Sequence, residues 1–195
     1  RQVDYFEQYS RQYTDLPFLV EINDGQAGKC LRAGRLERYA GTEHGDWKLL
    51  MWDAEAKEPR MPNGSIGDRW ATENKGKWNL ELHDSVLDQP IAPSLSLIDD
   101  NDGSAEVELE FFGSEGVIKR SVPTRTIKTV DGSVTVTTVF DLMMARFGVD
   151  RGLEGFDADS YDNANAPYTP AWQEQYTGIH RDTVVKYARE WGRNG

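Results

Sequence analysis

The side chains that could carry chemistry are few and scattered along the chain. The histidines are His44, His83 and His180, and none has a Cys, His or Asp partner at metal-ligand spacing. Cys30 is the only cysteine, which excludes an intrachain disulfide and any cluster or zinc site built from several cysteines. Ser65 lies in a Gly-Ser-Ile-Gly stretch that lacks the Gly-x-Ser-x-Gly spacing of a nucleophile elbow. We therefore predict no catalytic, cofactor-binding or metal-binding residue, and we expect His180 to cap a helix rather than act as a base.

Three further patterns are compatible with binding but have a simpler structural interpretation. Residues 99–103 (Asp-Asp-Asn-Asp-Gly) have the composition of a calcium loop, but without EF-hand spacing or its terminal Glu they predict a solvated turn. Residues 105–112 alternate as a strand, with glutamates on one side. Such a side could contact a basic partner or bind a metal, but the pattern favours a solvated face. A carbohydrate-stacking surface is the alternative to core packing for the tryptophans, which include Trp47, Trp52, Trp70 and Trp78.

Composition restricts the classes of function further. The chain has 195 residues, enough for one domain, and 38% of them are hydrophobic, enough for a core. Its net charge is −11 and its pI about 4.7, which argues against nucleic-acid binding because phosphate affinity depends mainly on basic charge. No apolar run approaches the roughly 18 residues of a membrane span, and no signal-peptide pattern opens the chain.

The first half of the chain is predicted to be a helix followed by short strands. Residues 2–13 have helical periodicity, and Pro17 confirms that the helix stops before it. The turn at 23–25 separates predicted strands 18–22 and 29–33, which places Cys30 in a strand as a small buried residue. The apolar run 47–53 is a further predicted strand, with a return beginning at 60–61. Residues 62–101 lose periodicity and are predicted to be irregular, with short strands at 78–82 and 94–98.

The second half predicts a hairpin and then helices. Asp131-Gly132 between β-branched runs is a strong hairpin signal for strands 125–130 and 133–139. Thr138 and Asp141 form a capping-box-like start of a helix that ends at Gly148. Its predicted buried face consists of Phe140, Met143, Met144 and Phe147. Residues 152–166 are predicted to be loop, and the whole order indicates an α+β fold with mainly antiparallel strands.

Residues 166–195 predict a closing helix pair. Thr169 caps the first helix, Pro170 follows at its first position, and Gly178 ends it. The second helix begins near His180 and is predicted to end at Gly192, with one buried face formed by Val184, Tyr187, Ala188 and Trp191. Two interpretations remain open, a packing unit of a larger enzyme or a DNA-binding helix-turn-helix with a basic face. That face would contain Arg181, Lys186, Arg189 and Arg193.

Several stretches of the amino-acid sequence resemble a known family. Residues 168–172 (Tyr-Thr-Pro-Ala-Trp), 177–179 (Thr-Gly-Ile) and 188–191 (Ala-Arg-Glu-Trp) resemble a segment of the molybdopterin oxidoreductases, the DMSO reductase superfamily. Residues 13–20 (Tyr-Thr-Asp-Leu-Pro-Phe-Leu-Val) are similar to another stretch of that region. A narrower resemblance, to the catalytic alpha subunit of respiratory nitrate reductase, rests on four more stretches: 62–67 (Pro-Asn-Gly-Ser-Ile-Gly), 69–70 with 76–81 (Arg-Trp, Gly-Lys-Trp-Asn-Leu-Glu), 137–142 (Thr-Thr-Val-Phe-Asp-Leu) and 151–153 (Arg-Gly-Leu).

This resemblance implies an interior fragment of a much longer oxidoreductase subunit, since the chain begins at Arg1 and lacks the family's iron–sulfur and molybdenum ligand motifs. We expect one unit, 1–195, with a β-rich excursion at 62–136 and a helical closing segment at 137–195. The parent enzyme would reduce nitrate to nitrite at molybdenum bis-molybdopterin guanine dinucleotide. Its electrons would come from quinol through a membrane gamma subunit and the iron–sulfur clusters, which include a [4Fe-4S] cluster and those of a beta subunit.

No functional residue is carried over from the family, and the fragment itself is expected to be inactive, with no cofactor, no nucleic acid and no membrane span. The expected location is the cytoplasmic face of the membrane, with an outward-facing enzyme as the archaeal alternative. A nitrite oxidoreductase alpha subunit is the alternative parent, and a stand-alone helix-turn-helix or carbohydrate-binding module is the alternative class.

Overall fold

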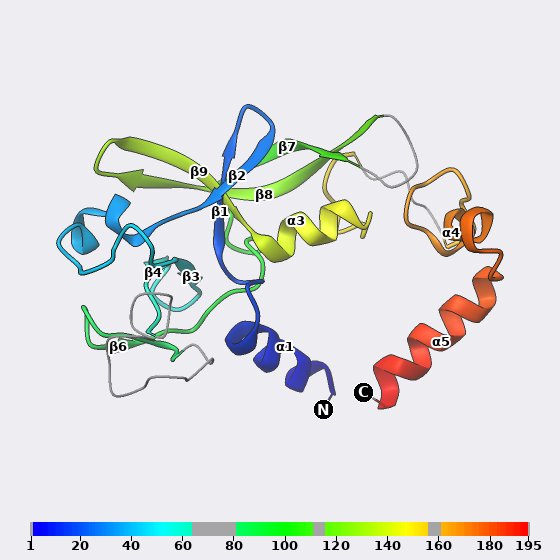
Figure 1. Cartoon of the computed structure of the whole chain (residues 1–195), viewed down its shortest axis with the longest axis horizontal. Coiled ribbons are helices and arrows are strands. Elements are labelled where there is room, and N and C mark those ends of the chain that lie inside the picture. Colours follow the sequence, from blue (N-terminus) through cyan, green and yellow to red (C-terminus); the bar gives the residue numbers. More distant parts are fainter. Residues whose placement is uncertain (1, 64–80, 111–115, 156–160, 195) are drawn as a thin grey trace.

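The fold is α+β, as the sequence predicts, and its strands pair antiparallel (Figure 1). The computed structural model describes residues 2–63, 81–110, 116–155 and 161–194. Helix α1 (Gln2–Tyr13) precedes a five-stranded sheet in the order β2-β1-β9-β8-β7. The strands of this sheet are β1 (Leu19–Asn23), β2 (Gln26–Cys30), β7 (Gly103–Glu110), β8 (Val117–Thr129) and β9 (Gly132–Thr138).

Two kinds of connection build the sheet. Tight turns join β1 to β2 and β8 to β9. The second turn is Val130-Asp131, one residue earlier than predicted, because Gly132 already pairs with Thr129 as the first residue of β9. Gly132 has a φ of 140° that a side chain would disfavour. The central contact is long-range, because β1 pairs with β9 through Leu19 opposite Thr138 and Ile22 opposite Thr135. The sheet also curls, so that the backbone N–H of Glu108 on β7 donates to the carbonyl of Gly25 beside β2 at 2.8 Å.

Helix α3 (Val139–Arg146) follows β9 directly and packs on the sheet through Ala145, which shares a buried cluster with Ile22, Val107 and Val122. Its N-cap is Thr138, whose hydroxyl accepts from the backbone N–H of Asp141 at 3.0 Å, as predicted. At its other end, the buried Arg120 guanidinium donates from Nη1 to the carbonyl of Ala145 at 2.6 Å and complements the helix dipole.

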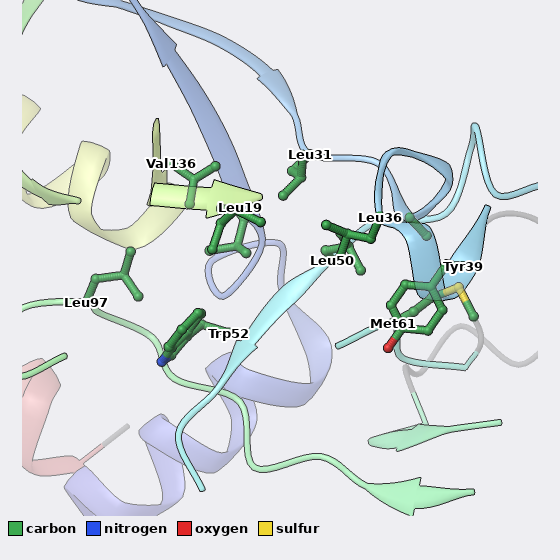
Figure 2. Close-up of a cluster of buried hydrophobic side chains, with 11 residues drawn as sticks. Leu19, Leu31, Leu36, Tyr39, Leu50, Trp52, Met61, Leu97 and Val136 are labelled. Carbon is green, nitrogen blue, oxygen red and sulfur yellow. The ribbon is translucent and has the colours of Figure 1, made fainter. Parts of the chain in front are cut away.

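Smaller elements surround one end of the sheet. They are two 3-10 turns, η1 (Ala33–Arg35) and η2 (Glu37–Tyr39), and two short hairpins, β3 (Met51–Asp53) with β4 (Glu58–Arg60) and β5 (His83–Asp84) with β6 (Gln89–Pro90). Figure 2 shows the main core that joins them to the sheet. Trp52 of β3 lies between Leu97 and the rest of this cluster, while Leu19 and Val136 enter it from the sheet. Burial of such side chains contributes about 1.5–3 kcal/mol each.

The chain closes with α4 (Pro170–Thr177) and α5 (Arg181–Asn194), which lie apart from the sheet in Figure 1. The predicted caps are confirmed. The Thr169 hydroxyl accepts from the N–H of Trp172 at 3.1 Å, and Gly178 adopts a left-handed conformation with φ 70°. His180 Nδ1 accepts from the N–H of Asp182 at 3.3 Å, so His180 does cap the start of α5.

Several expectations about burial were wrong. In α3 the fully buried residues are Asp141 and Ala145, whereas Phe147 is half exposed. Ala145 packs in the sheet cluster and Asp141 binds the loop at 94–98, so these two sides of the helix are the covered ones. The predicted buried face of α5 is not covered by the described residues: Tyr187 and Trp191 are 63% and 61% exposed. Helix α5 also continues past Gly192, which lies inside it, since neighbouring helix formers offset the cost of one glycine.

Of two further strand predictions, one failed and one was confirmed only in part. Residues 94–98 form a loop, since the backbone N–H of Leu97 bonds to a side chain instead of to a neighbouring strand. In the run 47–53, Met51–Asp53 forms β3 and pairs with the return strand β4, whereas Leu49 forms an isolated bridge with Arg32 and Trp47 is 55% exposed in a turn. The predicted strand at 78–82 lies mostly outside the described residues, as do Ser65, Trp70, Trp78 and most of the resembling stretches between 62 and 81.

Candidate functional site

The most elaborate polar site is centred on Asp141, a fully buried carboxylate in the first turn of α3. Its Oδ1 accepts from Arg151 Nη1 at 2.7 Å and from the Ser96 hydroxyl at 2.6 Å. Its Oδ2 accepts from the backbone N–H of Leu97 at 2.9 Å, and the Thr138 hydroxyl lies at the same distance. Four polar neighbours therefore surround the two carboxylate oxygens. We call Asp141, Ser96, Leu97, Thr138 and Arg151 the Asp141 latch.

The latch joins three segments of the chain, one of which is 45 residues from Asp141 in sequence. It connects the loop at 94–98, the start of α3 and the loop after α3. Because Arg151, the Ser96 hydroxyl and the Leu97 N–H already donate to the carboxylate, it has little capacity left to act as a general base or a metal ligand. Asp141 was predicted as part of a helix cap, but its ion pair with Arg151 was missed. The only sequence signal was that both positions belong to stretches of the family resemblance, 137–142 and 151–153.

A second buried carboxylate, Asp84, closes the small hairpins onto the core. Its Oδ2 accepts the hydroxyl proton of Tyr39, and its Oδ1 accepts the N–H groups of Val86 and Leu87 at 3.0 and 3.2 Å. Tyr39 and Asp84 are both fully buried. Burial, with the adjacent carboxylate, raises the pKa of Tyr39 well above its usual range. The phenol is therefore a hydrogen-bond donor in the folded protein and not an acid available at neutral pH.

The acidic turn at 99–103 contacts cations of this chain. Asp100 accepts the indole N–H of Trp52 and lies 3.2 Å from Lys57 Nζ, while Arg125 stacks over the Trp52 ring at 4.6 Å. The outward glutamates of β7 also pair with a basic side chain of this chain, since Lys119 lies 3.3 Å from Glu106 and from Glu108. The solvated-turn and solvated-face interpretations thus need one addition, namely that basic side chains of the same chain partly neutralise these carboxylates.

The histidines lie on three different elements. His44 and His83 have local carboxylate neighbours, Glu43 at 3.4 Å and Asp88 at 3.1 Å, and are about half exposed, as is His180 at the start of α5. Cys30 lies in β2, as predicted, but is only partly buried, and this burial raises the pKa of its thiol. Among the described residues, no group of three or more His, Cys, Asp or Glu side chains is arranged to hold a metal ion. The absence of catalytic and ligand residues stays a prediction.

The geometry gives little support to the two alternative interpretations, DNA binding by α5 and carbohydrate binding by the tryptophans. For a DNA-reading α5, Arg181 would have to face phosphate, yet its guanidinium donates from Nε to Glu174 at 3.0 Å and lies 3.3 Å from Asp162. This hydrogen bond lowers the pKa of Glu174. For a carbohydrate surface, Trp52 is buried in the core while Trp47 is exposed on a separate turn.

With the geometry established, the chain can be compared with known proteins. No family model matches it. It is 41% identical over 208 residues to the respiratory nitrate reductase 1 alpha chain of Escherichia coli, an alignment that covers 97% of this chain. It is 38% identical to the nitrate reductase alpha chain of Bacillus subtilis, over 100% of this chain, and 35% identical to the respiratory nitrate reductase alpha chain of a Bradyrhizobium species, over 98%. The chain is homologous to one segment of respiratory nitrate reductase alpha chains.

The homology confirms the resemblance and sets its extent. The chain spans only 16% of the E. coli and B. subtilis alpha chains and 19% of the Bradyrhizobium one. Within this nitrate reductase segment, stretches that carried the resemblance now have structural roles: 137–142 and 151–153 meet in the Asp141 latch, and 168–172 begins α4. None of the helices in the described ranges combines the length and apolarity needed to cross a bilayer.

Proposed function

We propose that the chain is a structural segment of the catalytic alpha subunit of a membrane-associated respiratory nitrate reductase. The observation that carries this proposal is homology over 97–100% of the chain to alpha chains of E. coli and B. subtilis. The proposed parent reduces nitrate to nitrite at a molybdenum bis-pterin guanine dinucleotide centre. It receives electrons from quinol through a gamma subunit and an iron–sulfur beta subunit, at the cytoplasmic face of the membrane.

The described residues do not fit a role as ligands of those cofactors. Iron–sulfur clusters are held mainly by cysteine thiolates, and the single Cys30 is partly buried in a strand with a raised pKa, which disfavours the thiolate. The buried carboxylates Asp84 and Asp141 already accept hydrogen bonds from the protein. We therefore assign the molybdenum and cluster ligands to other parts of the alpha subunit, and we expect this segment alone to reduce no nitrate.

In this proposal the segment acts as a scaffold. The curled sheet and α3 share a buried cluster, and the Asp141 latch fixes the loops on either side of α3. Scaffolds of this kind support a reaction centre indirectly, because packed and hydrogen-bonded elements hold the loops between them in one arrangement. We treat residues 1–195 as one unit, with 62–136 as its β-rich part and 137–195 as its helical closing part.

The test is to identify the native polypeptide that contains this sequence. Antibodies raised against the chain should detect, in membranes of the source organism grown on nitrate, a polypeptide several times larger than 22.1 kDa. Immunopurified material should contain molybdenum and iron and reduce nitrate with an artificial electron donor. A native polypeptide of 22.1 kDa, or a larger one without molybdenum, would refute the proposal. Purified complex that only oxidises nitrite would instead identify a nitrite oxidoreductase.

A further inference from the structure

Helices α1 and α5 each leave an aromatic face uncovered by the described residues. Tyr5 and Tyr9 of α1 are 61% and 46% exposed, and Tyr187 and Trp191 of α5 are 63% and 61% exposed. Tyr13 continues the α1 row with 47% exposure. We call these five residues the terminal aromatic faces. Single exposed aromatics are common on protein surfaces, but rows of them on two helices are typical of surfaces that contact another part of an assembly.

Within each of the two faces, the aromatic rings contact one another. Successive aromatics are four residues apart, so they lie on one side of each helix, and their rings touch with centroids 6.2 Å apart for Tyr5–Tyr9 and 6.1 Å apart for Tyr187–Trp191. The opposite side of α5 has the basic residues Lys186, Arg189 and Arg193. An amphipathic helix gains most of its stability from covering its apolar side, and the rest of the described chain leaves this side of α5 in solvent.

The angle between α4 and α5 is held by interactions that do not involve the aromatic face. Gln173 donates from Nε2 to the carbonyl of Ile179 at 2.8 Å, and Arg181 Nε donates to Glu174 at 3.0 Å. Helix α5 is therefore presented to a partner in a preset orientation, which lowers the entropy cost of contact. In Figure 1, α1 and α5 both extend to the same side of the sheet.

We propose that the terminal aromatic faces are the docking surface for the rest of the same alpha-subunit polypeptide, which covers them with an apolar surface. This inference rests on the proposed function. In the E. coli and B. subtilis relatives, the homologous segment is 16% of the chain, so most of the polypeptide lies outside it. The faces lie on α1 and α5, the first and last helices of the described residues. A partner in the same polypeptide has a higher effective concentration than a separate protein or a second copy.

The experiment uses site-specific photo-cross-linking in the complete native subunit. p-Benzoylphenylalanine replaces Tyr187 in one variant and Tyr9 in another, since it preserves an aromatic ring at each position. The matched controls place it at Lys186 and Glu7, exposed positions on other sides of the same helices. After irradiation, peptide mapping by mass spectrometry identifies the cross-linked partner of each position.

We expect positions 187 and 9 to cross-link to peptides of the same polypeptide outside residues 1–195, with a several-fold higher yield than positions 186 and 7. Cross-links to a second copy, to another subunit, or between α1 and α5 themselves would overturn the proposal, as would yields equal to those of the controls. A long molybdenum-containing subunit without the expected cross-links overturns the docking surface alone. A native polypeptide of 22.1 kDa overturns both this proposal and the proposed function.

Discussion

Removing the carboxylate of Asp141 should destabilise the fold more than most single substitutions in this chain. Asp141 is fully buried and pairs with Arg151 at 2.7 Å, and the Arg151 side chain is only 14% exposed. Asp141→Ala leaves that guanidinium without its carboxylate partner and the N–H of Leu97 without its acceptor. Breaking a buried ion pair in this way costs about 3–5 kcal/mol, a large part of the roughly 5–15 kcal/mol by which domains are stable.

The assay is equilibrium unfolding in urea, followed by tryptophan fluorescence and circular dichroism. With a typical urea m-value of about 2–3 kcal/mol/M, a loss near 4 kcal/mol lowers the midpoint by about 1.3–2 M. Arg151→Ala should cost less than Asp141→Ala, because the Ser96 hydroxyl and the Leu97 N–H still donate to the carboxylate. The double variant should lose less than the sum of the two single losses, with a coupling of about 1–3 kcal/mol.

The matched control is an exposed ion pair of the same chain, Glu7 with Arg11, four residues apart on α1 at 3.3 Å. Its coupling in the same double-mutant cycle should be about 0.3–0.5 kcal/mol. If Asp141→Ala costs under about 1 kcal/mol, or if the Asp141–Arg151 coupling is as small as that of the control pair, the latch does not hold the fold as argued.

Three further predictions test other parts of the structure. Gly155→Ala should lower stability by about 1–3 kcal/mol, because its φ is 90° and a Cβ would lie 2.8 Å from a backbone carbonyl oxygen, whereas Gly41→Ala, with open space around it, should be nearly neutral in the same urea assay. Because the pKa of Tyr39 is raised in the folded state, its contribution to stability is complete below the unfolded pKa of about 10 and is lost as pH rises above that value, so alkaline denaturation should be less steep for Tyr39→Phe. Cys30 should react with iodoacetamide more slowly in the native chain than in urea, since burial raises the pKa of its thiol; equal rates, measured by mass spectrometry, would contradict this.

Local signals predicted the local structure well. The caps at Thr138 and Thr169 and the left-handed stop at Gly178 occur as expected, and the predicted hairpin forms with its turn one residue earlier, at Val130-Asp131. Each of these depends on the conformational preference of one residue or on a hydrogen bond between neighbours in sequence. The helix at 2–13 was predicted with its observed bounds, because its periodicity is strong and Pro17 stops it.

The buried polar site could be predicted only in part. Asp141 was recognised as a residue of the first helical turn, but nothing in the spacing of Ser96 or Arg151 indicates that they contact it across 45 and 10 residues. The loop at 94–98 illustrates the same limit. Its apolar Leu97 is fully buried, as a strand pattern would suggest, while its backbone N–H binds a carboxylate that the sequence could not place there.

By itself, the sequence determined the α+β class, the helix caps at Thr138 and Thr169, the stop at Gly178, the hairpin of β8 and β9 and the resemblance to nitrate reductase alpha chains, because these depend on residue types at short spacing. Tertiary structure alone decided that β1 pairs with β9, that Arg151 neutralises Asp141, and that α3 faces the sheet with Ala145. Periodicity states that a helix has an apolar side but not what covers it. For α5 that side, with Tyr187 and Trp191, stays exposed to solvent among the described residues.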